Sequence, residues 1–552
     1  MQAPNPKGTL LRIRNLRIEA GAGSAWKEIV HGVSLDLAAG EMLGLIGESG
    51  AGKSTIGLAA MGFARPGCRI SGGEVVFNDI DLLKDVKELK RVQGTRVAYV
   101  AQSAAAAFNP AYRLIRQCIE VPVVRQRERK SKVVERVRNL FTRMHLPNPN
   151  GIGDRFPHQV SGGQLQRVMA SMAMSPRPAL IVFDEPTTAL DVTTQVEVLA
   201  AVRETIRDLG MAGIYISHDL AVVAQMADRI MVLKNGNVVE EGSTDQVLQQ
   251  PREAYTRNLV GQRRFRKQHV PDAQSAVLTV DRVSAGYHGV PVLENVSIEA
   301  RTGETVAVVG ESGSGKSTLA RVVAGLLKPM EGRVLLDGTP LLPSFKQRPR
   351  EELRAIQMIH QMPDTALNPQ QIVGKIIGRP LAFYFGLTGA RREERVRELL
   401  RMVEMDPDIF LKRRPGELSG GQKQRLCIAR ALAADPKIII CDEVTSALDP
   451  LIADEILKLL DRLQHEKQLT YIFITHDLAT VSAIADKVVV MKAGRIVEQG
   501  SKEEIFAPPH DPYTELLLSS TPKMETDWLD NLLDERDAAR KSRSGEVAPA
   551  EA

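Results

Sequence analysis

The sequence repeats itself over nearly its whole length, and this repeat constrains the fold more than any other feature. The segment GLIGESGAGKST at 44–55 returns as AVVGESGSGKST at 307–318, and LIVFDEPTTALD at 180–191 returns as IIICDEVTSALD at 438–449. The period of about 260 residues is much longer than the roughly 20–50 residues of a solenoid unit. The chain is therefore predicted to contain two homologous domains.

The predicted boundaries lie where the repeat stops. We predict four parts: a first domain at 8–260, a basic linker at 261–276, a second domain at 277–518 and a charged tail at 519–552. Four basic side chains lie in the linker: Arg263, Arg264, Arg266 and Lys267. Such a short charged run favours a solvated connector over a segment that binds lipid or nucleic acid. The tail is predicted to form a short amphipathic piece followed by disorder.

Within each copy, short apolar runs alternate with stretches of helical periodicity. We predict buried strands in both copies, at 43–46, 180–183, 213–217, 305–309, 438–441 and 471–475. Strands separated by helices indicate a largely parallel sheet covered on both faces, so each domain is predicted to be α/β. Charged segments of helical period near 112–160 and 370–418 predict an inserted helical subdomain.

Composition narrows the class of protein. The 43% hydrophobic and 25% charged residues are typical of globular chains, and the net charge of +5 neither requires nor excludes an acidic partner. Four separated cysteines without a C-x-x-C pair argue against a disulfide framework or a cysteine-held metal cluster. No apolar run reaches the roughly 18–20 residues of a membrane span, and the start lacks a signal-peptide core. We expect a cytosolic chain that serves any membrane process through partners.

A glycine-rich motif, G-x-x-x-x-G-K-S, stands between an apolar strand and a helical stretch in each copy. Glycines let the backbone wrap phosphates and aim N–H groups at them, and the following helix adds positive potential. Lys53 and Lys316 are predicted to neutralise phosphate charge, and Ser54 and Ser317 to coordinate Mg²⁺. The predicted phosphate-binding residues are Gly47, Glu48, Ser49, Gly50, Ala51, Gly52, Lys53, Ser54, Thr55, Gly310, Glu311, Ser312, Gly313, Ser314, Gly315, Lys316, Ser317 and Thr318.

Acidic pairs follow apolar strands at matching distances from the two motifs. Asp184 and Asp442 are predicted to hold Mg²⁺, because carboxylates at the carboxyl end of a strand can face the metal. The adjacent Glu185 and Glu443 are then placed to polarise an attacking water.

Two further polar residues recur after strands in both copies. Gln102 and Gln361 are predicted to contact Mg²⁺ or the water through their amides. His218 and His476 are predicted to meet a γ-phosphate. Each residue alone would be interpreted as an ordinary polar residue, and its duplication at an equivalent place favours the functional interpretation.

The order of these motifs resembles that of ATP-binding-cassette ATPases. The G-x-x-x-x-G-K-S motif, or P-loop, is followed in each copy by the glutamine, an SGGQ block, the Asp-Glu pair, an Ala-Leu-Asp segment and the histidine. The SGGQ blocks comprise Ser161, Gly162, Gly163, Gln164, Ser419, Gly420, Gly421 and Gln422. The resemblance covers about 8–260 and 277–518. It implies a RecA-like core with an antiparallel β-subdomain and the inserted helical subdomain, twice.

The resemblance also implies a sandwich dimer formed within one chain, with ATP and Mg²⁺ as cofactors. The P-loop, glutamine, acidic and histidine residues of the first half would face Ser419–Gln422 across one ATP, and those of the second half would face Ser161–Gln164 across the other. Asp191 and Asp449 would communicate between the halves. Both sites are expected to hydrolyse ATP, although Val444 replaces the proline found at Pro186. Tyr287 suits the adenine-stacking position of the family, whereas Trp26 does not align with it.

Segments after the glutamines resemble one branch of this family, which powers uptake of oligopeptides, dipeptides and nickel. They are Phe108-Asn109-Pro110 and Leu367-Asn368-Pro369, and the Tyr-Thr segments at 251–259 and 508–517 are also similar. This implies a peripheral ATPase on the cytoplasmic face of the cell membrane, with two permease subunits and an extracytoplasmic binding protein. Peptide is the favoured solute, and nickel, opines, glutathione and glycosides stay open. No cysteine follows Cys441, so the iron–sulfur centre of some relatives is not predicted.

The alternative is a tandem-cassette ATPase that remodels ribosomes. Such proteins carry a long charged helical linker between the halves, whereas the linker here is short. DNA-repair cassettes need zinc-binding cysteines and chromosome-organising ones a long coiled coil, and this sequence has neither. An importer ATPase without a nucleic-acid partner is therefore favoured.

Overall fold

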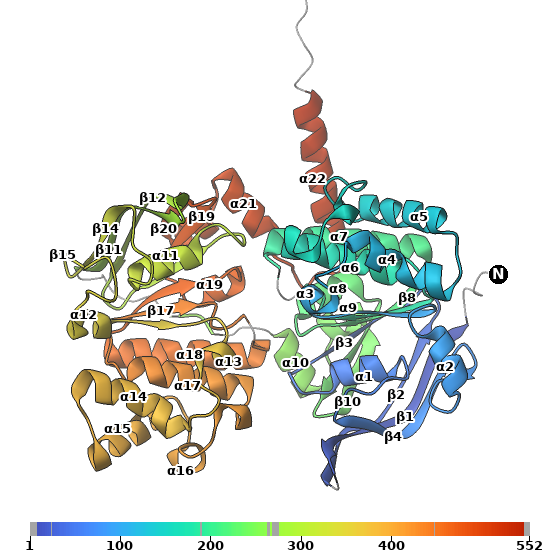
Figure 1. Cartoon of the computed structure of the whole chain (residues 1–552), viewed down its shortest axis with the longest axis horizontal. Coiled ribbons are helices and arrows are strands. Elements are labelled where there is room, and N and C mark those ends of the chain that lie inside the picture. The colour runs from blue at the N-terminus through green and yellow to red at the C-terminus, as the bar shows by residue number, and fades with distance from the viewer. Residues whose placement is uncertain are drawn as a thin grey trace, which may run out of the picture. The chain divides into compact units, whose positions relative to one another are not determined.

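The computed structural model describes residues 8–23, 25–187, 190–261, 265–267, 275–446 and 448–545. The chain folds as two compact units. The first unit combines residues up to 262 with residues from 522 onward, and the second comprises 263–521. Helix α22 (Trp528–Gly545), labelled in Figure 1, thus belongs to the unit that begins the chain.

A six-stranded sheet in the order β10-β9-β3-β8-β7-β6 forms the centre of the first unit. Five strands run parallel, and β10 pairs antiparallel with β9. The bounds are β3 (Met42–Gly47), β6 (Val97–Val100), β7 (Leu180–Asp184), β8 (Ala212–Ile216), β9 (Arg229–Lys234) and β10 (Asn237–Ser243). Every residue of β3, β7 and β8 is buried, as expected for unbroken apolar runs in a parallel sheet. The strands predicted here are confirmed.

Helices of the first unit cover this sheet and form the insertion. The insertion contains α4 and α5, joined by a π-helical turn at Val121–Arg125, and leads into α6. This confirms the helical subdomain predicted near 112–160. The helices are α1 (Lys53–Ala59), α2 (Val86–Val92), α3 (Ala104–Ala107), α4 (Leu114–Glu120), α5 (Lys130–Arg143), α6 (Gly162–Met174), α7 (Val192–Leu209), α8 (Leu220–Met226), α9 (Thr244–Gln249) and α10 (Ala254–Val260).

A second, antiparallel sheet in the order β2-β1-β4-β5 completes the first unit. Its strands are β1 (Thr9–Ala22), β2 (Ala25–Ala38), β4 (Cys68–Phe77) and β5 (Ile80–Asp81). Alternate residues such as Leu11, Ile13 and Val75 point into one apolar core with Ile56 of α1 and Leu45 of β3. Burial of this shared core fixes the phosphate-binding loop between the two sheets.

The second unit repeats this plan with sheets β16-β17-β18-β13-β19-β20 and β12-β11-β14-β15. Its strands are β11 (Ala276–Tyr287), β12 (Val290–Arg301), β13 (Thr305–Val309), β14 (Glu331–Leu336), β15 (Thr339–Pro340), β16 (Ile356–Ile359), β17 (Ile438–Asp442), β18 (Thr470–Ile474), β19 (Lys487–Lys492) and β20 (Arg495–Ser501). Its helices are α11 (Lys316–Val323), α12 (Arg350–Ala355), α13 (Pro363–Ala366), α14 (Val373–Phe385), α15 (Gly389–Met402), α16 (Pro407–Phe410), α17 (Gly420–Leu432), α18 (Pro450–Lys467), α19 (Leu478–Ile484), α20 (Lys502–Phe506) and α21 (Pro512–Ser519). The predicted strands and the helical insertion near 370–418 are confirmed.

The linker and the tail differ in part from the sequence prediction. Lys267 has a side chain only 1% exposed, so the prediction of a solvated connector is wrong at this position. A carboxylate partner, Asp486, explains why a lysine is buried there. The sequence predicts disorder after the amphipathic piece, in 534–552, but helix α22 continues through 534–545, so the prediction is wrong there. Residues 546–552, with Arg263 and Arg264 of the linker, lie outside the described residues. The tail contains one further helix, α22 (Trp528–Gly545).

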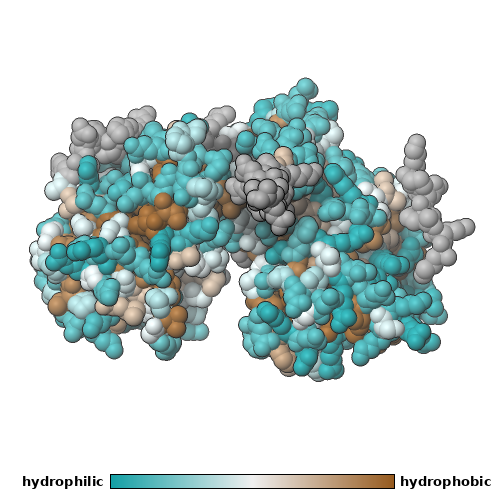
Figure 2. Space-filling view, turned by 90° about the horizontal axis from the view of Figure 1, so that it is seen from above, coloured by the Kyte–Doolittle hydropathy of each residue, from teal (hydrophilic) through white to brown (hydrophobic). Residues whose placement is uncertain are grey.

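None of the helices that the structure describes combines the length and the apolar character needed to cross a membrane. Hydrophilic residues cover most of the face shown in Figure 2, with apolar residues in small clusters.

Candidate nucleotide-binding sites

Each phosphate-binding loop is folded around its own lysine. Lys53 Nζ donates to the carbonyl oxygens of Gly47 at 2.6 Å and Glu48 at 2.9 Å, and Lys316 Nζ makes the equivalent bonds at 2.8 and 2.7 Å. The loop requires glycine at Gly47, where φ is 146° and a Cβ would lie 2.0 Å from the carbonyl oxygen of Leu233. A ring of backbone around a buried ammonium group is a cradle of the right charge for phosphate.

Serine and aspartate lie together at the carboxyl edge of each parallel sheet. The hydroxyl of Ser54 donates to Oδ1 of Asp184 at 2.6 Å, and the hydroxyl of Ser317 lies 3.4 Å from Oδ1 of Asp442. The two halves of each pair are more than a hundred residues apart in sequence, and the order of the strands brings them together. Hydroxyl and carboxylate oxygens are the ligands that Mg²⁺ prefers.

The glutamate beside each aspartate is held by its backbone and by two side chains. Glu185 adopts a φ of 49°, and its N–H donates to the carbonyl oxygen of Ile216 at 2.9 Å. Its carboxylate accepts a bond from Gln102 Nε2 at 2.8 Å and lies 3.2 Å from Nδ1 of His218. The left-handed backbone is strained for a glutamate, and such strain clusters at functional sites.

The second unit assembles the same three side chains. The amide of Gln361 donates to Glu443, and His476 Nδ1 lies 3.3 Å from the other carboxylate oxygen of Glu443. Glu443 has a φ of 51°, so its backbone shares the left-handed conformation. The structure thus brings together, in both units, the residues that the sequence predicts for ATP hydrolysis.

Contact with glutamate shifts the titration of both histidines. Burial lowers the pKa of His218 and of His476, but the hydrogen bond and the charge of the partner glutamate outweigh burial, so that each pKa lies above the ordinary 6.5. Burial raises the pKa of Glu443, but His476, together with Lys316 and Ser446, outweighs burial and leaves that pKa below its ordinary value. Burial and the charge of Glu443 raise the pKa of Asp442.

The two SGGQ blocks begin helices α6 and α17. Ser161 Oγ accepts the N–H of Gln164 at 3.3 Å, and Gln164 Oε1 accepts the N–H of Ser161 at 3.2 Å. Ser419 and Gln422 form the same reciprocal cap at 3.3 and 3.0 Å. Both serines are exposed. The reciprocal cap makes an accessible, ordered helix N-terminus in each unit, which suits an anion.

The two aromatic candidates for adenine binding occupy different strands. Tyr287 ends β11, and its hydroxyl accepts a bond from Arg321 Nη1 at 2.9 Å. Trp26 lies on β2, the partner of β1, with the guanidinium of Arg69 4.3 Å from its ring centre. The two residues are therefore not equivalent, in agreement with the alignment of the two copies.

Sequence reasoning did not assign a role to two tyrosines that contact the phosphate-binding loops. The hydroxyl of Tyr255 accepts the backbone N–H of Glu48 at 3.2 Å, and that of Tyr513 accepts the backbone N–H of Glu311 at 3.0 Å. Both tyrosines belong to the repeated Tyr-Thr segments, so the repeat itself was the available signal.

The two sites differ at one aspartate. Tyr99 donates its hydroxyl proton to Oδ2 of Asp184 at 2.6 Å, and Arg65 lies 3.3 Å from the same oxygen. In the second unit, Met358 occupies the position on β16 that Tyr99 occupies on β6. A methionine side chain has no hydroxyl group to donate. Asp442 therefore does not receive the hydrogen bond that Asp184 accepts from Tyr99.

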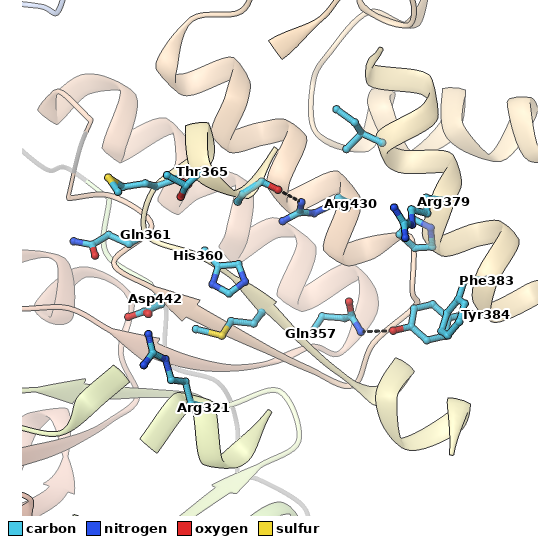
Figure 3. Close-up of a pocket in the computed structure, with 15 residues that line it drawn as sticks. Arg321, Gln357, His360, Gln361, Thr365, Arg379, Phe383, Tyr384, Arg430 and Asp442 are labelled. Atoms are coloured by element: carbon cyan, nitrogen blue, oxygen red, sulfur yellow. Dashed lines mark hydrogen bonds between the residues drawn. The ribbon is translucent and has the colours of Figure 1, made fainter. Parts of the chain in front are cut away.

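A cavity of about 880 Å³ opens beside the second site (Figure 3). It lies between the sheet and the helical insertion, and its lining joins Gln361 and Asp442 to residues of α14 and α17. Three arginines dominate its charge: Arg321, Arg379 and Arg430. Burial and the charges of Arg430 and Arg321 lower the pKa of His360, which also lines the cavity. Apolar and aromatic groups line the same cavity, among them Met362 and Phe383, which are 55% and 49% exposed.

Family models match the chain over both units. A model described as ABC transporter matches residues 30–188 and 293–446. A model described as oligopeptide/dipeptide transporter, C-terminal region, matches residues 497–545. The chain belongs to the ATP-binding-cassette transporter family and is an ATPase that binds ATP. Within that family it is a fused tandem ATPase of the oligopeptide, dipeptide and nickel importer branch.

Similar proteins of known name span almost the whole chain. The glutathione import ATP-binding protein GsiA of Salmonella choleraesuis (strain SC-B67) is 36% identical over 545 residues, which cover 90% of this chain and 86% of that protein. GsiA of Escherichia coli (strain K12) is 35% identical over 570 residues, covering 94% and 90%. Among solved structures, cbiO1 from Clostridium perfringens is 34% identical, with a TM-score of 0.39, covering 42% of this chain and 91% of that one.

Proposed function

We propose that the chain energises uptake of short peptides, through two separate permease subunits and an extracytoplasmic solute-binding protein. The observation that carries this proposal is a complete set of hydrolytic residues in each unit, in a chain whose C-terminal region matches the peptide-transporter model. Relatives named for glutathione import make a tripeptide a suitable solute. Nickel and opines are the other solutes to test.

Mg²⁺ fits the oxygen ligands gathered beside each phosphate-binding loop. The residues that would hold it are Ser54, Gln102, Asp184, Ser317, Gln361 and Asp442. Bound there, Mg²⁺ would neutralise charge on the phosphate oxygens of ATP. Lys53 and Lys316 then bind the same phosphates from within their loops, and the loop N–H groups orient them.

Glu185 and Glu443 orient and polarise the water that attacks the γ-phosphate. Their carboxylates are already aligned by Gln102 and Gln361 and by the histidines. The raised pKa of each histidine favours its protonated form, and an imidazole N–H would donate a bond to the γ-phosphate.

The two cassettes act as an intramolecular sandwich. In this arrangement Ser161–Gln164 complete the second ATP site and Ser419–Gln422 complete the first, with Tyr287 against the adenine of the second. The exposed, reciprocally capped helix starts support it, because a γ-phosphate is an anion that such a terminus binds. Asp191 and Asp449 cap α7 and α18 close to these blocks. The two cassettes close when ATP binds and separate after hydrolysis, and this motion drives the permease.

The cavity of the second unit receives a cytoplasmic helix of a permease subunit. Its exposed apolar side chains would bury the helix, and its three arginines select acidic residues on it. The chain then lies on the cytoplasmic face of the cell membrane as a peripheral protein. Because the cavity adjoins Gln361 and Asp442, a helix seated there is coupled directly to the ATP site.

Solute uptake in a strain that lacks the gene tests this function. The wild-type gene should restore uptake of labelled dipeptides, tripeptides or glutathione, and a gene encoding Glu185→Gln with Glu443→Gln should not. Ribosome pelleting in the same lysates tests the alternative of ribosome remodelling. Uptake that is equal with and without the gene for peptides, nickel and opines, together with ATP-dependent ribosome binding, would reject the importer.

A further inference from the structure

The segment that follows each cassette in the chain packs on the other cassette. We use first and second cassette for residues 8–260 and 277–518. The linker residues from 263 onward belong to the second unit, and the tail residues from 522 onward belong to the first unit. The linker and the tail are thus exchanged between the two cassettes. The residues that hold the linker differ in chemistry from those that hold the tail.

Lys267 anchors the linker to the second cassette. Its backbone N–H donates to the carbonyl oxygen of Ala483 at 2.8 Å, and its ammonium group contacts the carboxylate of Asp486 and lies 3.3 Å from the hydroxyl of Thr305. Phe265 packs against the apolar cluster formed by the helices of that unit. A buried lysine requires such a carboxylate, because an unpaired charge there would be costly.

Gln225 anchors the tail to the first cassette. This residue of α8 is 3% exposed, and its amide nitrogen donates to the carbonyl oxygens of Lys523 at 3.0 Å and Glu525 at 2.8 Å. Its amide oxygen accepts the N–H of Leu529 at 3.0 Å. The buried side chain of Gln225 therefore forms hydrogen bonds with three backbone groups of the tail, and these bonds fix the position of the tail along α8.

Charge and apolar burial complete the tail contact. Arg203 of α7, 7% exposed, pairs with Asp530 and also donates to the carbonyl oxygen of Gln225 at 3.3 Å. Three apolar tail residues are nearly excluded from solvent, with Trp528 at 6%, Leu529 at 0% and Leu532 at 5% exposure. Apolar burial of this kind is the main source of affinity in such contacts.

The two docking faces occupy equivalent places in the repeat. The residue equivalent to Gln225 in the second cassette is Ala483, which receives Lys267, and the residue equivalent to Arg203 is Asp461. The charge is reversed at one of these positions: Arg203 on the first cassette pairs with Asp530 of the tail, whereas Asp461 occupies the equivalent place on the second cassette. Asp486, the partner of Lys267, has an acidic equivalent on the first cassette, Asp228. Each face would meet a like charge if it received the wrong segment.

We propose that the α7–α8 face of the first cassette is a docking site for segment 523–532 of this chain, and that the exchange of linker and tail pairs the two cassettes. The peptide bonds between the cassettes are then not needed to keep them together. Pairing through these faces is independent of ATP binding and of the transported solute, so it goes beyond the proposed function.

Cleavage of the purified full chain tests the pairing. A protease recognition sequence is inserted between His269 and Val270, so that cleavage leaves Lys267 on the first fragment and the tail on the second. Without nucleotide, the wild-type fragments should elute together in size-exclusion chromatography. Asp530→Arg and Lys267→Glu should each weaken their association by about tenfold or more, because a buried charge loses its partner.

Two matched variants control for the change of charge. Asp534→Arg, at an exposed position of α22, and Arg266→Glu, at the exposed residue beside Lys267, should leave the fragments together. Arg203→Asp combined with Asp530→Arg should restore association, and the melting temperature of each uncut chain shows that it has folded. Fragments that separate in the wild type, or that stay together equally in every variant, overturn the proposal.

Discussion

His218 Nδ1 lies 3.2 Å from the carboxylate of Glu185, and the equivalent pair in the second unit, His476 and Glu443, is 3.3 Å apart. The two members of each pair come from the ends of different strands, and the glutamate backbone is left-handed in both. The two units differ in sequence but keep the same strained glutamate backbone beside a histidine. This repetition indicates that the glutamate–histidine pair has the same role in ATP hydrolysis in both units.

Replacing both glutamates tests their role in ATP hydrolysis. Glu185→Gln with Glu443→Gln keeps the shape of the side chains but removes the carboxylates that polarise water, so steady-state ATP hydrolysis should fall by about 10²-fold or more. ATP binding should persist, because the phosphate-binding loops are unchanged. Glu204→Gln, an exposed position on α7, is the matched control and should keep full turnover. Unchanged hydrolysis in the double variant would contradict the assignment.

The histidine–glutamate pairs predict a definite pH dependence. The pKa of His476 is raised above 6.5 in the folded chain, so its contribution to stability is complete below 6.5 and is lost as the pH rises through the folded pKa. The difference in melting temperature between wild type and His476→Gln should therefore be larger near pH 6 than near pH 9. Histidine titration by NMR should place His476 above 6.5 and lower it in Glu443→Gln. A difference that grows with pH would contradict this sign.

Local patterns predicted much of the fold and of the site. The P-loops and the strand-ending Asp184 and Asp442 depend on nearby sequence, and the structure places each at the end of a buried strand as predicted. The reciprocal caps at Ser161 and Ser419 were not predicted. The repeat made these predictions stronger, because a chance motif does not recur in the same order.

Contacts between distant segments were not predictable in the same way. Tyr99 reaches Asp184 across 85 residues, and Gln225 holds Leu529 across 304, so no period or spacing announces either contact. The basic composition of the linker predicts an exposed lysine, but Lys267 is buried. Its carboxylate partner, Asp486, lies 219 residues further along the chain and is brought to it only by the fold. Such contacts depend on the tertiary arrangement, whereas propensity and periodicity describe one segment at a time.

The tyrosines of the repeated Tyr-Thr segments should tune ATP affinity. Tyr255→Phe removes the acceptor of the Glu48 N–H, and Tyr513→Phe removes that of the Glu311 N–H, while the rings and their packing stay. A single hydrogen bond contributes about 1 kcal/mol, so ATP affinity at the affected site should fall about fivefold. Calorimetric titration measures it, with Tyr112→Phe at an exposed position as control. Equal affinities in all three variants would show that the tyrosines only pack.

The basic cavity of the second unit should separate transport from hydrolysis. Arg379 lines the cavity and is exposed, so Arg379→Glu should repel the acidic residues expected on a permease helix and leave the ATP site intact. Peptide uptake by the complemented strain should drop about fivefold or more, while ATP hydrolysis by the purified chain stays within about twofold. Arg391→Glu on α15, exposed and outside the lining of the cavity, is the matched control and should transport normally. Loss of hydrolysis in the purified Arg379→Glu chain, or normal uptake by it, would show that the cavity is not the permease contact.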